Sequence, residues 1–423
     1  MQTPLHLLIS ESWVEGTMID LAKNYSIMAR RAKKSVIREL LKLTSKPEII
    51  SFAGGLPDPA EFPTAQIEEC IHEVLAESGS KALQYGSTEG EAALKKELIK
   101  IVAKNGMEIN EDNILITVAS QQALDLIGRI FIDPSDPIIL ELPSYLGGIQ
   151  AFRSYGANFI GVPMDEDGVD VDKLADTLER LKEDDEHYKF LYLVPDFQNP
   201  SGVTLSAERR HRILELAEQY KFLIIEDSPY RELRFEGEHL PMLGSLDKSG
   251  NVISLFTFSK TFVPGIRLGW VVAHPRIIQK LAVAKQSVDL CTPPLSQYIA
   301  AKFCEKGYLE PHIQKVVNVY RDKKNAMIAA FEKYMPKVPG LSWTNPQGGL
   351  FLFLTLPEDI SADDMFYTAL ENNVAYVIGS AFFCDNGGQN TMRLNFSYPT
   401  IDQIDEGVKR LAETIEKFIA KRK

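Results

Sequence analysis

The sequence predicts an α/β fold: a large domain with a mixed, mostly parallel sheet flanked by helices, and a smaller α+β domain. From residue 114 onward, β-prone apolar runs alternate with segments of helical pattern, which is typical of such a sheet. Several runs are apolar at consecutive positions, as expected for strands covered on both faces. After about residue 310 the alternation stops and a long helical stretch follows. We therefore expect a large domain at 51–310 and a small domain at 311–423, which residues 1–50 join.

The expected strands of the large domain are apolar runs that end in polar or turn residues. They cover residues 114–120, 138–144, 158–164, 190–196, 222–228, 252–259 and 269–274. Helical segments lie between many of them, and one opens on Ser206, a preferred N-cap residue, with Glu208 in its first turn. The link between the last two strands is too short for a helical crossover, so these strands should be antiparallel neighbours.

Beyond residue 310 the expected elements are those of a small α+β domain. A long helix covers residues 312–334, strands cover 348–357, 374–379 and 392–398, and further helices begin at Ser361 and after the last strand. Near the start of the chain, SVIRELLKL also has a helical pattern.

Charge and composition argue against several classes of partner and site. Lysine and arginine total 46 and aspartate and glutamate 58, so the net charge is −12, and no basic block stands out. Nucleic acid and anionic membranes are therefore not expected as main partners. No apolar run reaches the roughly 18 residues of a membrane span, and the N-terminus lacks a secretory signal pattern. The scattered cysteines indicate reduced thiols in a cytoplasmic protein, and the histidines show no metal-binding spacing.

Chemically useful residues follow the predicted strands at the points where the strands end. In open α/β sheets, ligands gather at the carboxyl ends of the strands. The residues found there combine an amine, a carboxylate, phenols, amides and anion-binding groups: Ser120, Gln121, Tyr145, Gln198, Asn199, Asp227, Tyr230, Ser259, Lys260 and Arg267.

Each of these residues also has an ordinary structural explanation. Asp227 could cap a turn, Ser120 could be a helix N-cap, and Lys260 could be a solvated loop lysine. Asn199 could serve a turn, and the tyrosines could be half-buried core residues. These explanations leave open why such residue types occupy successive strand ends.

Pyridoxal phosphate chemistry uses nearly all of these groups. The cofactor needs a lysine that binds its aldehyde, an acid against the pyridine nitrogen, and donors to its ring hydroxyl and phosphate. Ser120 at a helix N-terminus, and Ser259 with Arg267, suit a phosphate dianion. Lys260 would hold the cofactor and, once displaced by substrate, move the Cα proton as a base. Competing motifs are incomplete, because neither P-loop nor GxGxxG glycine spacing is present.

The chain resembles the fold-type I pyridoxal phosphate aminotransferases of class I and II, in the branch that contains 2-aminoadipate and kynurenine aminotransferases. The resemblance covers nearly the whole chain. It is carried, in chain order, by SVIRELLKL, SFAGGLPDP, LQYGSTEG, ASQQALDL, ELPSYLGG, FQNPSG, EDSPY, FTFSK, PGIRLGW, GGLFLF and MRLNFSYP.

The resemblance implies a role for each residue of the cofactor site. Lys260 matches the lysine that binds the cofactor, and Asp227 matches the partner of the pyridinium. Asn199 and Tyr230 match the donors to the ring oxygen, and Tyr145 matches the aromatic residue that stacks on the ring. The phosphate cup corresponds to Ser120, Gln121, Ser259 and Arg267. Tyr85 matches a tyrosine that reaches the phosphate of the neighbouring subunit, which implies a homodimer with shared active sites.

The resemblance also implies how substrate is bound. Arg393 matches the arginine that pairs with the substrate α-carboxylate, and Gly55 the backbone beside it; without the resemblance, Arg393 would be interpreted as a surface ion pair. Ser35 and Arg38 share one face of the predicted helix in the N-terminal segment, and a solvated helix face explains them equally well. In the family the matching helix covers the active site and contacts the substrate side chain, so Arg38 could pair with a distal carboxylate.

The expected activity is transamination between an L-amino acid of the 2-aminoadipate, aromatic or aliphatic type and 2-oxoglutarate, by a ping-pong sequence. One alternative is a β-lyase or decarboxylase on the same fold. Another is a transcription regulator with a degenerate aminotransferase-like domain. The roughly one hundred N-terminal residues lack a basic helix-turn-helix, which argues against the regulator.

Overall fold

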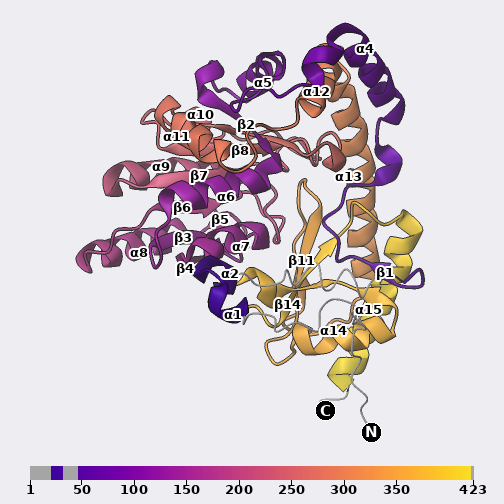
Figure 1. The fold of residues 1–423 in the computed structure, drawn as a ribbon. Helices are drawn as coiled ribbons and strands as arrows, with labels where there is room; N and C mark the ends of the chain where they lie inside the picture. The colour runs from indigo at the N-terminus through magenta and orange to yellow at the C-terminus, as the bar shows by residue number, and fades with distance from the viewer. Residues whose placement is uncertain (1–20, 32–45, 421–423) are drawn as a thin grey trace, which may run out of the picture.

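The computed structural model describes residues 21–31 and 46–420, and a central sheet organises its larger part (Figure 1). In this part of the chain the sheet has the strand order β2-β9-β8-β7-β6-β3-β4-β5. The strands are β2 (Ile114–Val118), β9 (Leu268–Val272), β8 (Val252–Thr257), β7 (Leu223–Asp227), β6 (Phe190–Leu193), β3 (Pro137–Leu142), β4 (Asn158–Asp165) and β5 (Gly168–Val169).

The directions of the strands confirm the mixed, mostly parallel sheet. The pairs β8–β7, β7–β6, β6–β3 and β3–β4 are parallel. β9 runs antiparallel to both β8 and β2. The short link between β8 and β9 passes through a single 3₁₀ turn, η3 (Pro264–Ile266), so these two strands are antiparallel neighbours, as their spacing predicts.

Consecutive apolar residues of the strands pack against different layers of helices. In β3, Ile138 and Leu140 belong to one core cluster, whereas Ile139 belongs to another. The first layer contains α6 (Ala119–Phe131), α7 (Leu146–Tyr155) and α11 (Pro275–Gln286). The other face is covered by α8 (Val171–Glu183), α9 (Ala207–Tyr220), α10 (Leu243–Leu246), α5 (Ala92–Lys104) and α12 (Pro294–Glu305). Both faces are therefore buried, which explains the uninterrupted apolar runs.

The smaller part of the structure is built on an antiparallel sheet in the order β10-β11-β14-β13. Its strands are β10 (Ser342–Trp343), β11 (Phe351–Thr355), β14 (Thr391–Asn395) and β13 (Val377–Ile378). Three helices pack with it: α13 (Leu309–Tyr334), α14 (Ala362–Glu371) and α15 (Ile401–Ala420). In Figure 1, α13 runs from the large sheet down to this smaller part. The domain limits predicted from the sequence stay a prediction.

The strand predicted at 374–379 is two short strands with different partners. β12 (Val374–Ala375) pairs in parallel with β1 (Ile50–Ser51), whereas β13 pairs with β14. The pairing of β1 attaches the chain near residue 50 to the smaller part. A sequence pattern cannot show this division, because both pieces are apolar and only their partners differ.

The remaining described elements are short, apart from one helix. They are α1 (Leu21–Asn24), α2 (Ile27–Arg31), η1 (Pro59–Glu61), α4 (Thr64–Ala82), η2 (Glu111–Asn113) and η4 (Gly379–Phe382). The predicted helix that carries Ser35 and Arg38 lies outside the described residues. Within the described ranges, no helix is long and apolar enough to cross a membrane.

The segment after β1 is fastened to α13 by polar contacts. The Lys323 ammonium donates to Asp58 Oδ2 at 2.6 Å and to the Ser397 carbonyl at 2.9 Å. The Tyr320 hydroxyl accepts a bond of 2.9 Å from the Asp58 N–H. These contacts fix the segment that carries Gly55 beside the carboxyl ends of the large sheet.

Candidate active site

Lys260 follows β8 in a tight turn, and its amine reaches the segment after β1. Its Nζ donates a hydrogen bond of 2.7 Å to the Gly55 carbonyl. Burial, followed by the positive charges of Arg393 and Arg267, lowers the pKa of the amine to about 8. The neutral amine that a nucleophile or base requires therefore accumulates as pH rises through about 8, well below the range of an ordinary lysine.

Asp227 ends β7 with one carboxylate oxygen bonded and the other free. Its Oδ2 accepts a hydrogen bond of 2.9 Å from the Tyr192 hydroxyl, whereas its Oδ1 is buried without a partner among the described residues. Burial raises the pKa of Asp227 to about 7, although the Tyr192 hydrogen bond opposes the rise. A buried oxygen without a partner is costly, and a protonated ring nitrogen would supply the missing donor.

Arg393, Asn199 and Tyr230 form a buried chain of hydrogen bonds. Arg393 Nη1 donates to Asn199 Oδ1 at 2.9 Å, and Asn199 Nδ2 donates to the Tyr230 hydroxyl at 3.0 Å. The Asn199 amide and the Tyr230 hydroxyl are therefore held as one unit. This position suits two groups that must act together on a single ring oxygen.

The Arg393 guanidinium lies deep between aromatic rings, not at the surface. It is 2% exposed, and its carbon lies 4.2 Å from the centre of the Phe351 ring and 5.2 Å from that of Phe382. Nη2 donates to the Ala53 carbonyl at 3.0 Å, and Nε has no partner in the described part of the chain. Burial lowers the pKa of Arg393 to about 10. A buried arginine with an unused donor is suited to a carboxylate ligand.

The predicted phosphate-binding residues surround the start of α6. Ser120 and Gln121 lie in the first turn of α6, and the Ala119 N–H donates to the Arg267 carbonyl at 3.1 Å. A Cβ on Gly269 would lie 2.8 Å from the Ser120 nitrogen, so glycine lets β9 pass beneath this turn. The helix N-terminus, two hydroxyls and a guanidinium match a phosphate dianion.

Ser259 is oriented by its neighbour Thr257. The Thr257 hydroxyl donates to Ser259 Oγ at 2.9 Å and accepts from the Ser259 N–H at 3.1 Å. Arg267 has φ of 55° and is exposed. Gln121 and Arg267 line the same surface hollow.

Tyr145 is the N-cap residue of α7, and the charges of other site residues act on its hydroxyl. Burial raises the pKa of its hydroxyl, and the charge of Asp227 acts in the same direction. A Cβ on Gly147 would lie 2.5 Å from the Tyr145 ring. Only glycine at 147 therefore leaves the ring in its observed position.

Three predicted site residues are not brought into this cluster. Tyr85 lies in the turn after α4, and its side chain is 78% exposed. Ser35 and Arg38 lie outside the described residues. The other predicted residues lie around the carboxyl ends of β3, β6, β7 and β8, at the start of α6, or at the β11–β14 pair, and Gly55 lies in the segment after β1.

Comparison with known families identifies the chain. Residues 49–411 match the model of the family described as aminotransferase class I and II. The chain belongs to this family.

Named relatives of this aminotransferase cover almost its whole length. Aromatic-amino-acid aminotransferase 1 of Thermococcus litoralis is 47% identical over 96% of this chain and 98% of its own. The 2-aminoadipate transaminase of Thermus thermophilus is 43% identical over 93% of this chain and 96% of its own. The crystal structure of Pyrococcus horikoshii kynurenine aminotransferase, in complex with PMP, has a TM-score of 0.91 and 45% identity over 94% of this chain and 98% of that one.

These comparisons confirm the predicted branch, fold type and cofactor. The protein is a pyridoxal phosphate-dependent aminotransferase of fold type I. The three relatives named above, which are 43–47% identical to this chain, are all aminotransferases, and none is a lyase, a decarboxylase or a regulator.

The aminotransferase contains site residues that the sequence analysis did not select. Tyr192 donates to Asp227, and Glu141 accepts bonds from the Val194 N–H at 2.9 Å and from Gln198 Nε2 at 3.1 Å. Burial raises the pKa of Glu141 to about 8. Gln198 also donates to the Pro143 carbonyl at 2.7 Å, which ties together the loops after β3 and β6. The signal for Glu141 was a carboxylate inside an otherwise apolar run, IILELPS.

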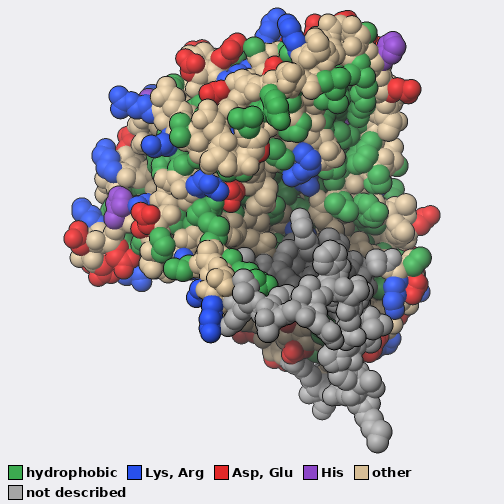
Figure 2. All heavy atoms as spheres, viewed as in Figure 1, with side chains coloured by type: hydrophobic (Ala, Val, Ile, Leu, Met, Phe, Trp, Pro, Cys, Tyr) green, Lys and Arg blue, Asp and Glu red, His purple; other side chains and the backbone are tan. Residues whose placement is uncertain are grey.

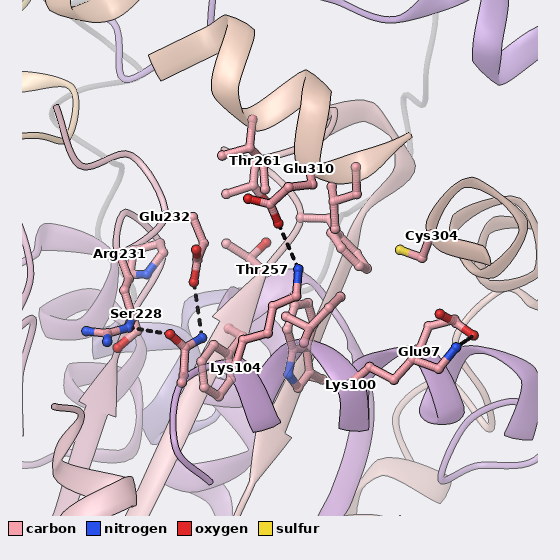
Figure 3. Close-up of a pocket in the computed structure, with 18 of the residues that line it drawn as sticks. Glu97, Lys100, Lys104, Ser228, Arg231, Glu232, Thr257, Thr261, Cys304 and Glu310 are labelled. Atoms are coloured by element: carbon pink, nitrogen blue, oxygen red, sulfur yellow. Dashed lines mark hydrogen bonds and ion pairs between the residues drawn. The ribbon is translucent and has the colours of Figure 1, made fainter. Parts of the chain in front are cut away.

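A separate cavity lies between α5, the start of α13 and the strands β8 and β9 (Figure 3). Lys104 Nζ and Glu310 Oε2 form a salt bridge of 2.9 Å across the cavity, and the Cys304 thiol points into it. Ser228 and Thr257 belong to its wall. Lys260, Asp227 and Arg393 do not line this cavity, so the predicted chemistry lies elsewhere.

Proposed function

We propose that this aminotransferase transfers an amino group between an L-amino acid of the 2-aminoadipate, aromatic or aliphatic type and 2-oxoglutarate. The observation that carries the proposal is the unused Nε of the buried Arg393, a donor that suits the α-carboxylate common to both substrates. The names of the relatives support the range of side chains, since they include aromatic amino acids, 2-aminoadipate and kynurenine.

The residues that hold the cofactor divide its recognition among them. Lys260 would bind its aldehyde, Asp227 Oδ1 would accept a hydrogen bond from its protonated ring nitrogen, and Tyr145 would pack on its ring. The Asn199 amide and the Tyr230 hydroxyl would bind its ring oxygen. Ser120, Gln121, Ser259 and Arg267 would bind its phosphate.

During turnover the side chains bind, orient and move protons. Pyridoxal phosphate, when bound, supplies an electron sink for the bonding pair at the substrate Cα. Arg393 binds the α-carboxylate beside the Gly55 backbone, which directs the Cα–H bond toward Lys260. The Lys260 amine, with its pKa of about 8, would take the proton from the substrate Cα and deliver it to the carbon that was the cofactor's aldehyde carbon. Asp227 keeps its negative charge opposite the protonated ring nitrogen throughout.

Substrate side chains are proposed to meet Ser35 and Arg38. An arginine paired with a distal carboxylate favours glutamate and 2-aminoadipate, and an arginine turned aside admits an apolar or aromatic side chain. One site then serves both halves of the ping-pong cycle. This proposal depends on the family resemblance, because both residues lie outside the described ranges.

We also propose a homodimer in which Tyr85 reaches the phosphate site of the neighbouring subunit. Apolar side chains gather on the α4 side of the molecule (Figure 2). On α4 and the turn after it, the exposed ones are Ile71, Leu75, Leu83 and Tyr85. An exposed apolar patch of this kind is typical of a protein–protein interface. Tyr85 contributes to this patch and is too exposed to serve a buried site of its own subunit.

We propose a cytoplasmic location for the enzyme. Its four cysteines are free thiols, and Cys70 and Cys291 are buried. Unpaired thiols support a reducing compartment.

A half-reaction screen tests the proposed activity. Holoenzyme is mixed with single amino acids, and loss of the visible absorbance of the bound cofactor is followed together with release of the matching 2-oxo acid. We expect stoichiometric 2-oxo acid from glutamate and from at least one of 2-aminoadipate, an aromatic amino acid and leucine. Release of carbon dioxide or of pyruvate with ammonia, without the 2-oxo acid, would instead identify a decarboxylase or β-lyase.

A further inference from the structure

Tyr192 and Asp227 form a buried pair on neighbouring parallel strands. Tyr192 lies in β6 and is 0% exposed, and Asp227 ends β7 and is 1% exposed. The Tyr192 hydroxyl donates to Asp227 Oδ2 at 2.9 Å. This bond occupies one carboxylate oxygen, and the other, the buried Oδ1, has no hydrogen-bond partner within residues 21–31 and 46–420. The pair therefore fixes which oxygen is available.

The Tyr192 ring is held from the helical side of the sheet. The Phe152 ring of α7 meets it edge-on, with centroids 5.5 Å apart. A Cβ on Gly148 would lie 2.8 Å from Tyr192 Cε1 and 3.1 Å from its hydroxyl oxygen. Glycine at 148 thus leaves room for the hydroxyl where Asp227 needs it.

We propose that Tyr192 is a positioning residue: its hydroxyl orients the Asp227 carboxylate so that Oδ1 faces the cofactor ring nitrogen, and it keeps that carboxylate charged. The inference rests on the proposed role of Asp227. A tyrosine that orients the acid acts on the reaction through Asp227 and touches neither cofactor nor substrate.

The surroundings of Asp227 explain why a donor is needed there. The ionisable groups on which its charge acts are Glu141, Tyr145, Tyr192 and Tyr230. None of these is a cation, and burial raises the pKa of Asp227. The Tyr192 hydrogen bond opposes this rise, so its loss favours a neutral carboxyl group. The proton shared with the ring nitrogen then moves toward Asp227, and the ring becomes a weaker electron sink.

The test compares three variants with a matched control in the holoenzyme. Tyr192→Phe removes only the hydroxyl, and Gly148→Ala displaces the ring but keeps the hydroxyl. Asp227→Asn gives the reference ¹⁵N shift and kcat of an enzyme in which no carboxylate faces the ring nitrogen. Tyr376→Phe is the control, since the Tyr376 hydroxyl is equally buried and donates at 2.6 Å to the Ala362 carbonyl of the small domain.

The readouts are the ¹⁵N NMR shift of the cofactor ring nitrogen, with labelled pyridoxal phosphate, and the separate values of kcat and KM. In Tyr192→Phe we expect the shift to move toward its Asp227→Asn position, with kcat about tenfold lower and KM within about twofold of the parent. Gly148→Ala should move both readouts in the same direction by less, and Tyr376→Phe should leave both unchanged.

Two results would overturn the proposal and are distinguishable. A parent-like ¹⁵N shift in Tyr192→Phe, while Asp227→Asn moves it, would show that Tyr192 only fills the core. If Asp227→Asn leaves the ¹⁵N shift unchanged, Asp227 does not interact with the ring nitrogen, and the proposal for Tyr192 is wrong as well. The proposed transamination is tested separately by the half-reaction screen.

Discussion

The two ends of the proposed cofactor site differ in how completely one chain encloses them. At the ring-nitrogen end, Asp227 is buried and bonded to Tyr192 inside the sheet. At the phosphate end, Gln121 and Arg267 are exposed and line an open surface hollow. Electrostatic interactions are stronger in a buried environment and are screened at the surface. A substitution at the closed end should therefore cost more activity than one at the open end.

Lys260 lies between the two ends, and its loss should have the largest effect. We expect Lys260→Ala to lower turnover by at least ~10⁴-fold, because both the covalent link to the cofactor and the base are removed. Noncovalent cofactor binding should persist, because the residues at the ring-nitrogen end and at the phosphate end are unchanged. The check is turnover together with borohydride reduction of the parent holoenzyme and peptide mapping. Label on another lysine would show that the assignment of Lys260 is wrong.

The closed end is tested by Asp227→Asn. An uncharged amide cannot stabilise a protonated ring nitrogen, so we expect kcat to fall by about 10²-fold or more while the fold is retained. Asp405→Asn is the matched control, because Asp405 also accepts a bond from a tyrosine, Tyr334, at 2.9 Å, but is exposed. Steady-state kinetics and circular dichroism are the measurements. Turnover of Asp227→Asn near that of the control would exclude the proposed role.

The substrate side of the site is tested by Arg38→Ala. We expect glutamate and 2-aminoadipate to lose about 1.5–3 kcal/mol of transition-state stabilisation, the scale of a hydrogen bond to a charged group. Leucine and aromatic amino acids should change much less. The measurement is kcat/KM for both substrate classes in variant and parent. Equal losses in both classes would leave Arg38 without a role in side-chain recognition.

The open end is tested by complementation across the proposed dimer. Tyr85→Phe should lower activity by about tenfold, the scale of one hydrogen bond to a charged group. Chains with Tyr85→Phe are mixed with chains that carry Lys260→Ala. Each heterodimer then has one site with neither defect, if Tyr85 serves the partner subunit. Activity of the mixture above that of either homodimer supports active sites that are shared between subunits. If chain exchange is verified and no such increase appears, Tyr85 does not act in the partner's site.

The sequence predicted where the site residues lie along the chain better than it predicted the hydrogen bonds between them. Strand ends are marked by a change from apolar to polar residues, so Asp227 and Lys260 could be located from pattern alone. Tyr192 could not be selected in this way, because its partner lies on another strand and a tyrosine in an apolar run is typical of ordinary core. The role proposed for Arg393 also needed the family resemblance, because the sequence pattern does not show that its strand lies inside the small sheet and that its guanidinium is buried.

The smallest expected effect concerns the pKa of Lys260, which both ends influence. Its pKa of about 8 results first from burial, then from Arg393, then from Arg267. A lowered lysine pKa means that the reactive neutral amine accumulates as pH rises through 8. We therefore expect the rate at which apoenzyme captures pyridoxal phosphate to increase about fivefold from pH 7 to pH 8, and to level off near pH 9.

Removing one positive neighbour should move this profile to higher pH. Arg393→Met should move it further than Arg267→Met, because Arg393 is buried and solvent screens the exposed Arg267. Arg393→Lys keeps the charge and should leave the profile near that of the parent. The measurement is stopped-flow absorbance of cofactor capture across pH 6.5–9.5. A larger displacement in Arg267→Met than in Arg393→Met would contradict the distinction between a closed and an open end, since the exposed charge would then act on Lys260 more strongly than the buried one.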